Sequence, residues 1–181
     1  MFSMYKLLLF TGGVYKFNEF EEFVEDIGGL IVQIESLKIS RSMYFLSEEI
    51  KVLIIIPSKE ENELKTLAKQ IKGNIKTIDM KESEIEKIVL IFEIYKNLKT
   101  NEYMDLKTII HCLKNSQDFI KLEEEYKFEN ICNYDEFKEK IFELLYIMEE
   151  MKIIERIRKK EIYEYKLKTK IANSYLKEIY K

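Results

Sequence analysis

The sequence is poor in residues that break or cross-link a chain. Its 181 residues include one proline, five glycines, two cysteines, one histidine and no tryptophan. So little glycine and proline excludes collagen-like and low-complexity architectures, and two cysteines exclude a disulfide scaffold. No apolar run approaches the roughly 20 residues that span a bilayer, so we expect no membrane partner. With no secretory leader, a reducing cytoplasm is the expected location.

What the sequence does contain is a globular composition rich in charged and aliphatic residues. Hydrophobic residues make up 46% of the chain, which is enough for a core and excludes wholesale disorder. The abundance of isoleucine, lysine and glutamate resembles that of proteins from heat-adapted organisms, in which ion-pair networks are one stabilising device. The length fits one large domain or two small ones.

The net charge of −3 hides an uneven distribution. Residues 1–151 carry 20 basic and 29 acidic side chains, whereas residues 152–181 carry 10 basic and 4 acidic ones. An acidic body with a basic end favours a polyanion as the partner of that end. A solvated, lysine-rich terminus is the alternative explanation of the same pattern.

Residues 1–80 predict an α/β domain in which strands alternate with helices. Asn18 and Ser58 each precede a helical pattern, and a glutamate three residues later completes a capping box. Strands are expected over residues 4–10, 30–39, 43–46, 50–56 and 75–78. This order favours an α/β sandwich of the ferredoxin-like βαββαβ type, with a small doubly wound sheet as the alternative. We expect this domain to serve effector sensing or dimerisation.

Residues 83–181 predict a second, mainly helical domain, so the overall fold class is α+β. Apolar residues recur at helical spacing over about 83–99, 104–113 and 134–151. Two alternating stretches, Ile153 to Ile157 and Ile162 to Leu167, predict a β-hairpin with a basic tip. Weakly patterned residues 115–133 are interpreted as an inserted loop or short helix, and a terminal helix is expected over 171–180.

Three helices followed by a basic hairpin resemble a winged helix-turn-helix domain. The resemblance is clearest from Phe137 to Leu167, FKEKIFELLYIMEEMKIIERIRKKEIYEYKL, where a long helix passes directly into the hairpin. It implies a DNA-binding transcriptional regulator, similar to archaeal-type two-domain regulators, with helix 134–151 in the major groove. Duplex DNA is then the expected partner, and a homodimer is the usual state of such proteins.

The resemblance implies that basic residues of the hairpin contact phosphates. These residues are Arg156, Arg158, Lys159, Lys160, Lys166 and Lys168. Two features depart from the family pattern: the insertion at 115–133 replaces a short turn, and helix 134–151 is acidic and lacks the Arg, Asn or Gln that usually read bases. The alternative is therefore a protein-interaction or assembly factor whose winged helix does not bind nucleic acid.

Thr11, Gly12 and Gly13 follow the first predicted strand and precede a helix. Backbone amides at such a turn can hold a phosphate group. These three residues are therefore the candidates for binding a small-molecule effector, and a tight turn without a ligand is the alternative.

No catalytic or metal-binding set stands out from the sequence. His111 and Cys112 are neighbours, which point to different sides of a helix, so the histidine does not activate the thiol. Cys132 adds a third candidate ligand, but a zinc site needs four ligands with short paired spacing. We expect no enzymatic activity, no cofactor and no metal; an enzyme acting on a phosphorylated small molecule is the weakest hypothesis.

Overall fold

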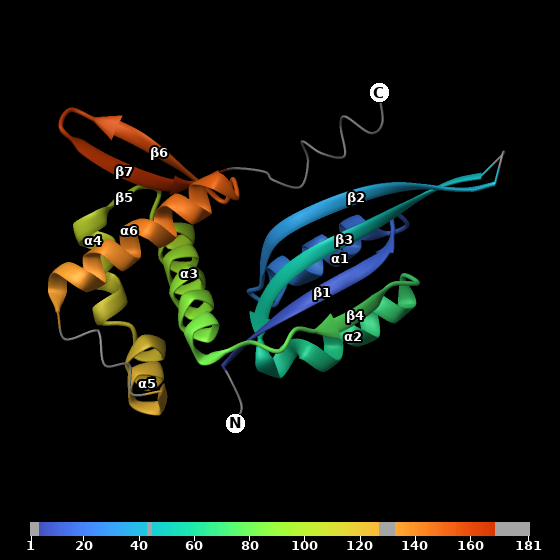
Figure 1. Ribbon diagram of the computed structural model, residues 1–181, viewed down its shortest axis with the longest axis horizontal. Helices are drawn as coiled ribbons and strands as arrows, with labels where there is room; N and C mark the ends of the chain where they lie inside the picture. The colour runs from blue at the N-terminus through green and yellow to red at the C-terminus, as the bar shows by residue number, and fades with distance from the viewer. Residues whose placement is uncertain (1–3, 43–44, 127–132, 169–181) are drawn as a thin grey trace. The chain divides into compact units, whose positions relative to one another are not determined.

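The computed structural model describes residues 4–42, 45–126 and 133–168 (Figure 1). The chain divides into two compact units, residues 1–81 and 82–181. Each unit combines helices with an antiparallel sheet, which makes the protein α+β. The predicted terminal helix over 171–180, and Cys132, lie outside the described residues.

The first unit is a four-stranded sheet with two α-helices, in the part of it that the structure describes. Its elements are β1 (Tyr5–Gly13), α1 (Phe17–Asp26), β2 (Leu30–Ser42), β3 (Phe45–Pro57), the short 3-10 helix η1 (Ser58–Glu60), α2 (Glu61–Gln70) and β4 (Asn74–Thr77). The strand order is β2-β3-β1-β4, and every neighbouring pair is antiparallel. This excludes the doubly wound alternative, whose strands run mainly parallel.

The core of this unit lies between one face of the sheet and both helices. Leu8 pairs with Ile54 and Phe10 with Val52, so these side chains share a face, and all four are fully buried. The ring of Phe20 on α1 lies 4.2 Å, centroid to centroid, from that of Phe10. Residues from α2 complete the same cluster, which consists of Leu8, Phe10, Phe17, Phe20, Val24, Ile50, Val52, Ile54, Ile56, Leu64, Ala68, Ile71 and Ile75.

The strands β2 and β3 are longer than predicted, with 13 residues each. The sequence predicted residues 43–46 and 50–56 as two separate strands. Backbone pairing nevertheless continues through this stretch, with Lys38 opposite Glu48 and Ser36 opposite Ile50. Backbone hydrogen bonding between two strands does not depend on apolar side chains, so the strands extend beyond the apolar pattern.

The capping box predicted at Asn18 does not form the start of α1. Helix α1 begins at Phe17, after Lys16 at a positive φ of 56°, and the cap makes no side-chain hydrogen bond. Phe17 is 2% exposed, so its burial fixes the start of the helix one residue earlier than Asn18. Helix α2 likewise begins after η1 without a side-chain cap, and Glu61 makes tertiary contacts instead.

The second unit places helices around a long first helix and closes with a three-stranded sheet. Its elements are α3 (Glu82–Thr100), β5 (Met104–Asp105), α4 (Leu106–Lys114), α5 (Gln117–Tyr126), α6 (Tyr134–Glu150), β6 (Ile154–Lys159) and β7 (Ile162–Leu167). The strand order is β5-β7-β6, again antiparallel. The side chain of Asn133 accepts a hydrogen bond from the Asp135 amide at 3.1 Å, which caps α6.

Helix α5 forms within the predicted insertion at 115–133 and belongs to the core. The Phe119 side chain is 1% exposed, and its ring centroid lies 5.6 Å from that of Phe137 on α6. A polar contact strengthens the junction, since Ser116 donates a hydrogen bond of 2.8 Å to the buried Glu93 of α3. The region is thus a packed helix over 117–126, and not a surface loop.

No helix among the described residues has both the length and the apolarity needed to cross a membrane.

Candidate functional site

The cations predicted to contact phosphates lie on the hairpin of β6 and β7, in its turn and just after β7. Two of them form ion pairs with carboxylates of the hairpin itself. The Lys159 ammonium is 2.7 Å from Glu164, and the Lys166 ammonium is 2.6 Å from Glu155. Glu155 and Lys166 are directly opposite in the register, where opposite charges attract across a sheet. In each pair the carboxylate raises the pKa of the lysine.

Arg156 is also engaged within the protein. Its Nε lies 3.6 Å from the Glu149 carboxylate on α6, and its guanidinium lies 5.0 Å from the centroid of the Tyr163 ring. Three of the six predicted phosphate ligands are therefore paired with carboxylates of the same unit. The other three, Arg158, Lys160 and Lys168, are exposed.

The outward side of α6 presents aromatic side chains to solvent. Phe142 is 49% exposed and Tyr146 is 58% exposed, although the two lie one turn apart on a helix whose other side is buried. The buried side consists of Phe137, Ile141, Leu144, Leu145 and Met148. An exposed aromatic pair on a helix that already has a complete apolar face is not required for packing.

Carboxylates surround this aromatic pair. Glu139, Glu143 and Glu150 are exposed and lie three or four residues from Phe142 or Tyr146, which makes them neighbours on the helix surface. Lys138 also lies one turn from Phe142. Helix α6 as a whole carries six acidic residues and two lysines, and one of these, Lys140, forms an ion pair with the buried Glu86 of α3.

A third exposed aromatic side chain, Tyr163, lies on the hairpin and is linked to α6 through Arg156. Glu149 follows Tyr146 by three residues and pairs with Arg156, which lies over the ring of Tyr163 on β7. Tyr163 is 45% exposed. We call Phe142, Tyr146 and Tyr163 the aromatic strip. Carboxylates flank its two rings on α6, whereas Tyr163 has two arginines beside it: Arg156, which Glu149 engages, and Arg158, which lies opposite Tyr163 in the register and is exposed. The α6 part of the strip is therefore suited to an apolar or cationic partner rather than to a polyanion.

Thr11, Gly12 and Gly13, the predicted effector site, lie inside β1 and not in a turn. Thr11 pairs with both Lys51 and Asn74, and Gly12 pairs with Ile50. The glycine at position 12 has a packing explanation, because a Cβ atom there would lie 2.7 Å from the Phe10 ring. The predicted turn with free amides is therefore absent from this stretch.

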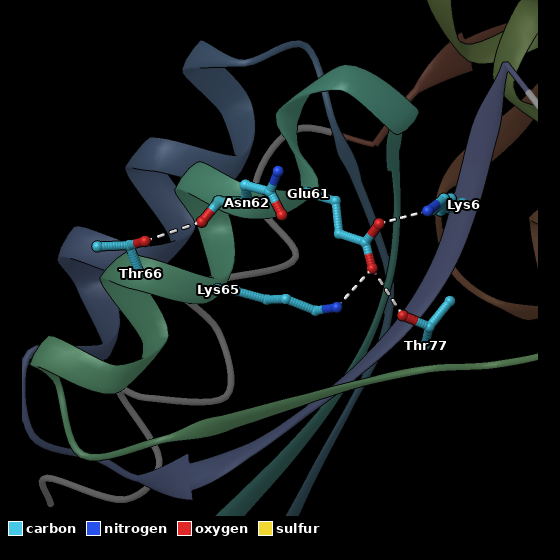
Figure 2. A network of polar contacts seen from close by, with 6 residues as sticks. All are labelled: Lys6, Glu61, Asn62, Lys65, Thr66 and Thr77. Atoms are coloured by element: carbon cyan, nitrogen blue, oxygen red, sulfur yellow. Dashed lines mark hydrogen bonds and ion pairs between the residues drawn. The ribbon is translucent and has the colours of Figure 1, made fainter. Parts of the chain in front are cut away.

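A polar network joins α2 to two strands of the first unit (Figure 2). The Glu61 carboxylate forms an ion pair with Lys6 of β1, accepts a hydrogen bond of 2.8 Å from the Thr77 hydroxyl of β4, and lies 2.6 Å from the Lys65 ammonium. Hydrogen bonds from both lysines lower the pKa of Glu61 to about 2. These three partners of the carboxylate all belong to the protein itself, so the network stabilises the fold.

Glu21 on α1 is a buried carboxyl group of a different kind. It is 8% exposed, and its Oε1 atom has no hydrogen-bond partner. Burial, together with the nearby charges of Glu25 and Glu22, raises the pKa of Glu21 to about 7. This carboxyl group therefore takes up a proton at a higher pH than an exposed glutamate does.

His111 and Cys112 lie on α4 without forming a site. His111 is exposed, and its Nε2 is 3.3 Å from the Asn115 amide nitrogen. Cys112 is a half-buried free thiol. Among the described residues, no three His, Cys, Asp or Glu side chains are grouped so that they could hold a metal ion.

The aromatic strip was not predicted from the sequence, although the sequence of α6 contains a signal for it. The buried face of α6 was predicted correctly, as Phe137, Ile141, Leu144, Leu145 and Met148. The two aromatic residues left over, at positions 142 and 146, fall among glutamates at a spacing of one turn. Aromatic residues on the polar side of an amphipathic helix are the pattern that points to an interface.

The geometry thus defines an α+β protein of two units with an exposed aromatic and acidic surface. A family model described as methyl-coenzyme M reductase operon protein C matches residues 5–92. That stretch covers the first unit and the first part of α3, a little under half of the chain.

Two further similarities cover parts of the chain. The uncharacterized protein MJ0094 of Methanocaldococcus jannaschii is 35% identical over 72 residues, which are 40% of this chain and 20% of that protein. The chain therefore spans about a fifth of the length of this curated relative. A crystal structure of an unknown protein from Galdieria sulphuraria covers 45% of this chain and 53% of its own, with 11% identity and a TM-score of 0.35. A TM-score that low supports no conclusion.

These findings correct the functional interpretation of the sequence. The prediction of a winged helix-turn-helix transcriptional regulator is wrong, because the family model that matches is that of methyl-coenzyme M reductase operon protein C. The same finding overturns the predicted partners, which were duplex DNA, a second copy of the chain and a small-molecule effector. The physical reason lies in α6 and the hairpin, where carboxylates dominate the helix and pair with half of the predicted phosphate ligands.

Proposed function

We propose that the protein is a non-catalytic interaction or assembly factor that binds a protein of the methyl-coenzyme M reductase machinery. The observation that carries the proposal is the aromatic strip, in which three rings are 45–58% exposed on the surface of one folded unit. Exposed aromatic side chains in a row are costly to keep in water and are typical of protein interfaces.

The similarity to the reductase operon family supports the choice of partner. The matched residues 5–92 include the whole sheet of the first unit, while the aromatic strip belongs to the second unit. We propose that the first unit is the part of the chain that resembles that family and that the second unit contacts the partner protein. Composition suggests that the protein acts in the cytoplasm.

The finer fold of the first unit is also a proposal. The order β2-β3-β1-β4, with α1 after β1 and α2 after β3, supports a ferredoxin-like arrangement of the βαββαβ type. Such sheets are used for many unrelated functions, so the topology itself adds nothing to the functional assignment.

Co-purification tests the proposal. The tagged 181-residue chain is produced together with the subunits of a methyl-coenzyme M reductase, and the eluate is analysed by size-exclusion chromatography. We expect a reductase component or its assembly intermediate to co-elute with the chain. The double variant Phe142→Ser, Tyr146→Ser should lose this partner, whereas Tyr15→Ser, which changes a tyrosine 61% exposed in the first unit, should retain it. Elution of the wild-type chain alone would contradict the proposal.

A further inference from the structure

We infer that the aromatic strip binds a positively charged amphipathic helix of the partner protein. The apolar side chains of that helix would cover Phe142, Tyr146 and Tyr163, and its lysines or arginines would meet the carboxylates beside them. This inference rests on the proposed function and adds the chemistry of the segment that is bound.

The spacing of the rings favours a helical partner. Phe142 and Tyr146 are one helical turn apart on α6, and Tyr163 extends the surface through the Arg156 contact. A second helix presents apolar side chains with the same repeat, at i, i+3, i+4 and i+7, and can lay them along such a row. Half-exposed aromatic rings are the residues that contribute most to affinity when a partner removes them from water.

The charges beside the strip determine the sign of the charge that the bound segment carries. Glu139, Glu143 and Glu150 are exposed next to the two rings of α6, against the single neighbouring Lys138. Carboxylates at the rim of an apolar contact attract lysine and arginine and increase the rate of association. Beside Tyr163, Arg156 is held by Glu149, and the exposed Arg158 lies opposite Tyr163, so the negative part of the strip is its α6 part.

Other occupants of this surface carry the wrong charge. Nucleic acid and anionic lipid surfaces are repelled by the carboxylates that border the two rings of α6. A second copy of this chain would set the glutamates of one α6 against those of the other, and like charges brought together at an interface oppose association. A cationic helix of a different protein meets both the apolar and the electrostatic requirement.

Photo-crosslinking identifies the bound segment directly. Benzoylphenylalanine is placed at position 142 or 146 of the 181-residue chain. The protein is irradiated in an extract of the source organism, and the cross-linked peptide is sequenced by mass spectrometry. We expect one peptide with a net positive charge and apolar residues at helical spacing. The same amino acid at position 15, exposed on the first unit, should not capture this peptide.

Two charge-reversed double variants compare the carboxylates beside the strip with carboxylates elsewhere on the protein. The variant Glu139→Lys, Glu143→Lys should lower the cross-link yield and the affinity by at least about 10-fold. The variant Glu22→Lys, Glu25→Lys makes the same change in net charge at exposed positions of α1 and should leave both within about 2-fold. Circular dichroism checks that both variants remain folded.

The remaining outcomes separate this inference from the proposed function. Capture of an acidic or uncharged peptide, or equal losses in the two double variants, would overturn the cationic helix and leave an interaction factor standing. A protein that co-purifies but never cross-links to position 142 or 146 would move the interface elsewhere and overturn the inference as well. Absence of any co-purifying protein would overturn the proposed function itself.

Discussion

The carboxylate of Glu61 accepts a hydrogen bond from the hydroxyl of Thr77 at 2.8 Å. The first residue of α2 is thereby fastened to the edge strand β4. The same carboxylate also reaches Lys6 on β1, so one side chain connects three elements of the first unit (Figure 2). Its side chain is 13% exposed, which reduces screening by water and makes the contacts effective.

Replacing this carboxylate should weaken the first unit. We expect Glu61→Gln to lower the free energy of unfolding by about 1–2 kcal/mol at pH 7, because two charge-assisted contacts are lost. The pKa of Glu61 is lowered from 4.5 to about 2, so its contribution is present above pH 4.5 and is lost as the pH falls through about 2.

Denaturant unfolding of both proteins at several pH values measures this difference. The gap between wild type and variant should narrow from pH 4.5 downward. Glu63→Gln, at an exposed position of the same helix, serves as the control and should change stability by less than about 0.5 kcal/mol. A gap that does not depend on pH would contradict the assignment.

Glu21 should behave in the opposite way. Its pKa is raised from 4.5 to about 7, so the folded state is stabilised relative to the unfolded one below pH 4.5, and that advantage is lost as the pH rises through 7. We expect Glu21→Gln to be more stable than wild type at pH 8, by roughly 2–3 kcal/mol at most, and similar to it at pH 4.

Thermal unfolding across this pH range tests the prediction for Glu21. Asp26, exposed on the same helix, provides the control, since Asp26→Asn removes a charge without removing a buried carboxyl group. Equal stability of Glu21→Gln and wild type at every pH would mean that the carboxyl group finds a partner or water in solution.

Position 73 should require glycine, because the Phe10 ring leaves no room for a side chain there. A Cβ atom on Gly73 would lie 2.3 Å from that ring, whereas one on Gly13 would be 3.9 Å from its nearest neighbour. Phe10 is fully buried and cannot move away. We expect Gly73→Ala to cost about 1–3 kcal/mol, as overpacking of a core does, and Gly13→Ala to cost less. The penalty of Gly73→Ala should shrink in a Phe10→Leu background, which a double-mutant cycle would detect.

Much of the fold follows from local sequence patterns. The apolar spacing of α6 and its Asn133 cap predict that helix, and the alternation after residue 153 predicts β6 and β7. Ion pairs cannot be predicted in this way, because the partner of each charged side chain depends on which residues the strand pairing places opposite each other. Glu155 and Lys166 are both visible in the sequence, but only the pairing of β6 with β7 brings them to 2.6 Å.

The functional interpretation failed for a related reason. A count of basic residues in the hairpin predicts a polyanion site, yet carboxylates on α6, β6 and β7 engage Arg156, Lys159 and Lys166. Net charge over a stretch of sequence therefore says little about the charge that a folded surface presents. The two exposed rings of α6 were the better signal, since a helix needs only one apolar face to pack.

Removing the rings of the strip should leave the fold intact. Phe142 and Tyr146 are about half exposed, whereas Phe137 on the same helix is 1% exposed. We expect Phe142→Ala and Tyr146→Ala to change the free energy of unfolding by less than about 1 kcal/mol each. Phe137→Ala should cost about 3–5 kcal/mol. Losses of similar size at all three positions, measured by urea unfolding, would mean that the strip is part of the core.

The affinity of the chain for its co-purified protein partner tests the central claim most directly. Isothermal titration calorimetry compares wild type, Tyr15→Ala and the double variant Phe142→Ala, Tyr146→Ala. If the aromatic strip is the interface, the double variant should bind about 100-fold more weakly or worse, and Tyr15→Ala should bind like wild type. Binding of the double variant within about 2-fold of wild type would contradict the account.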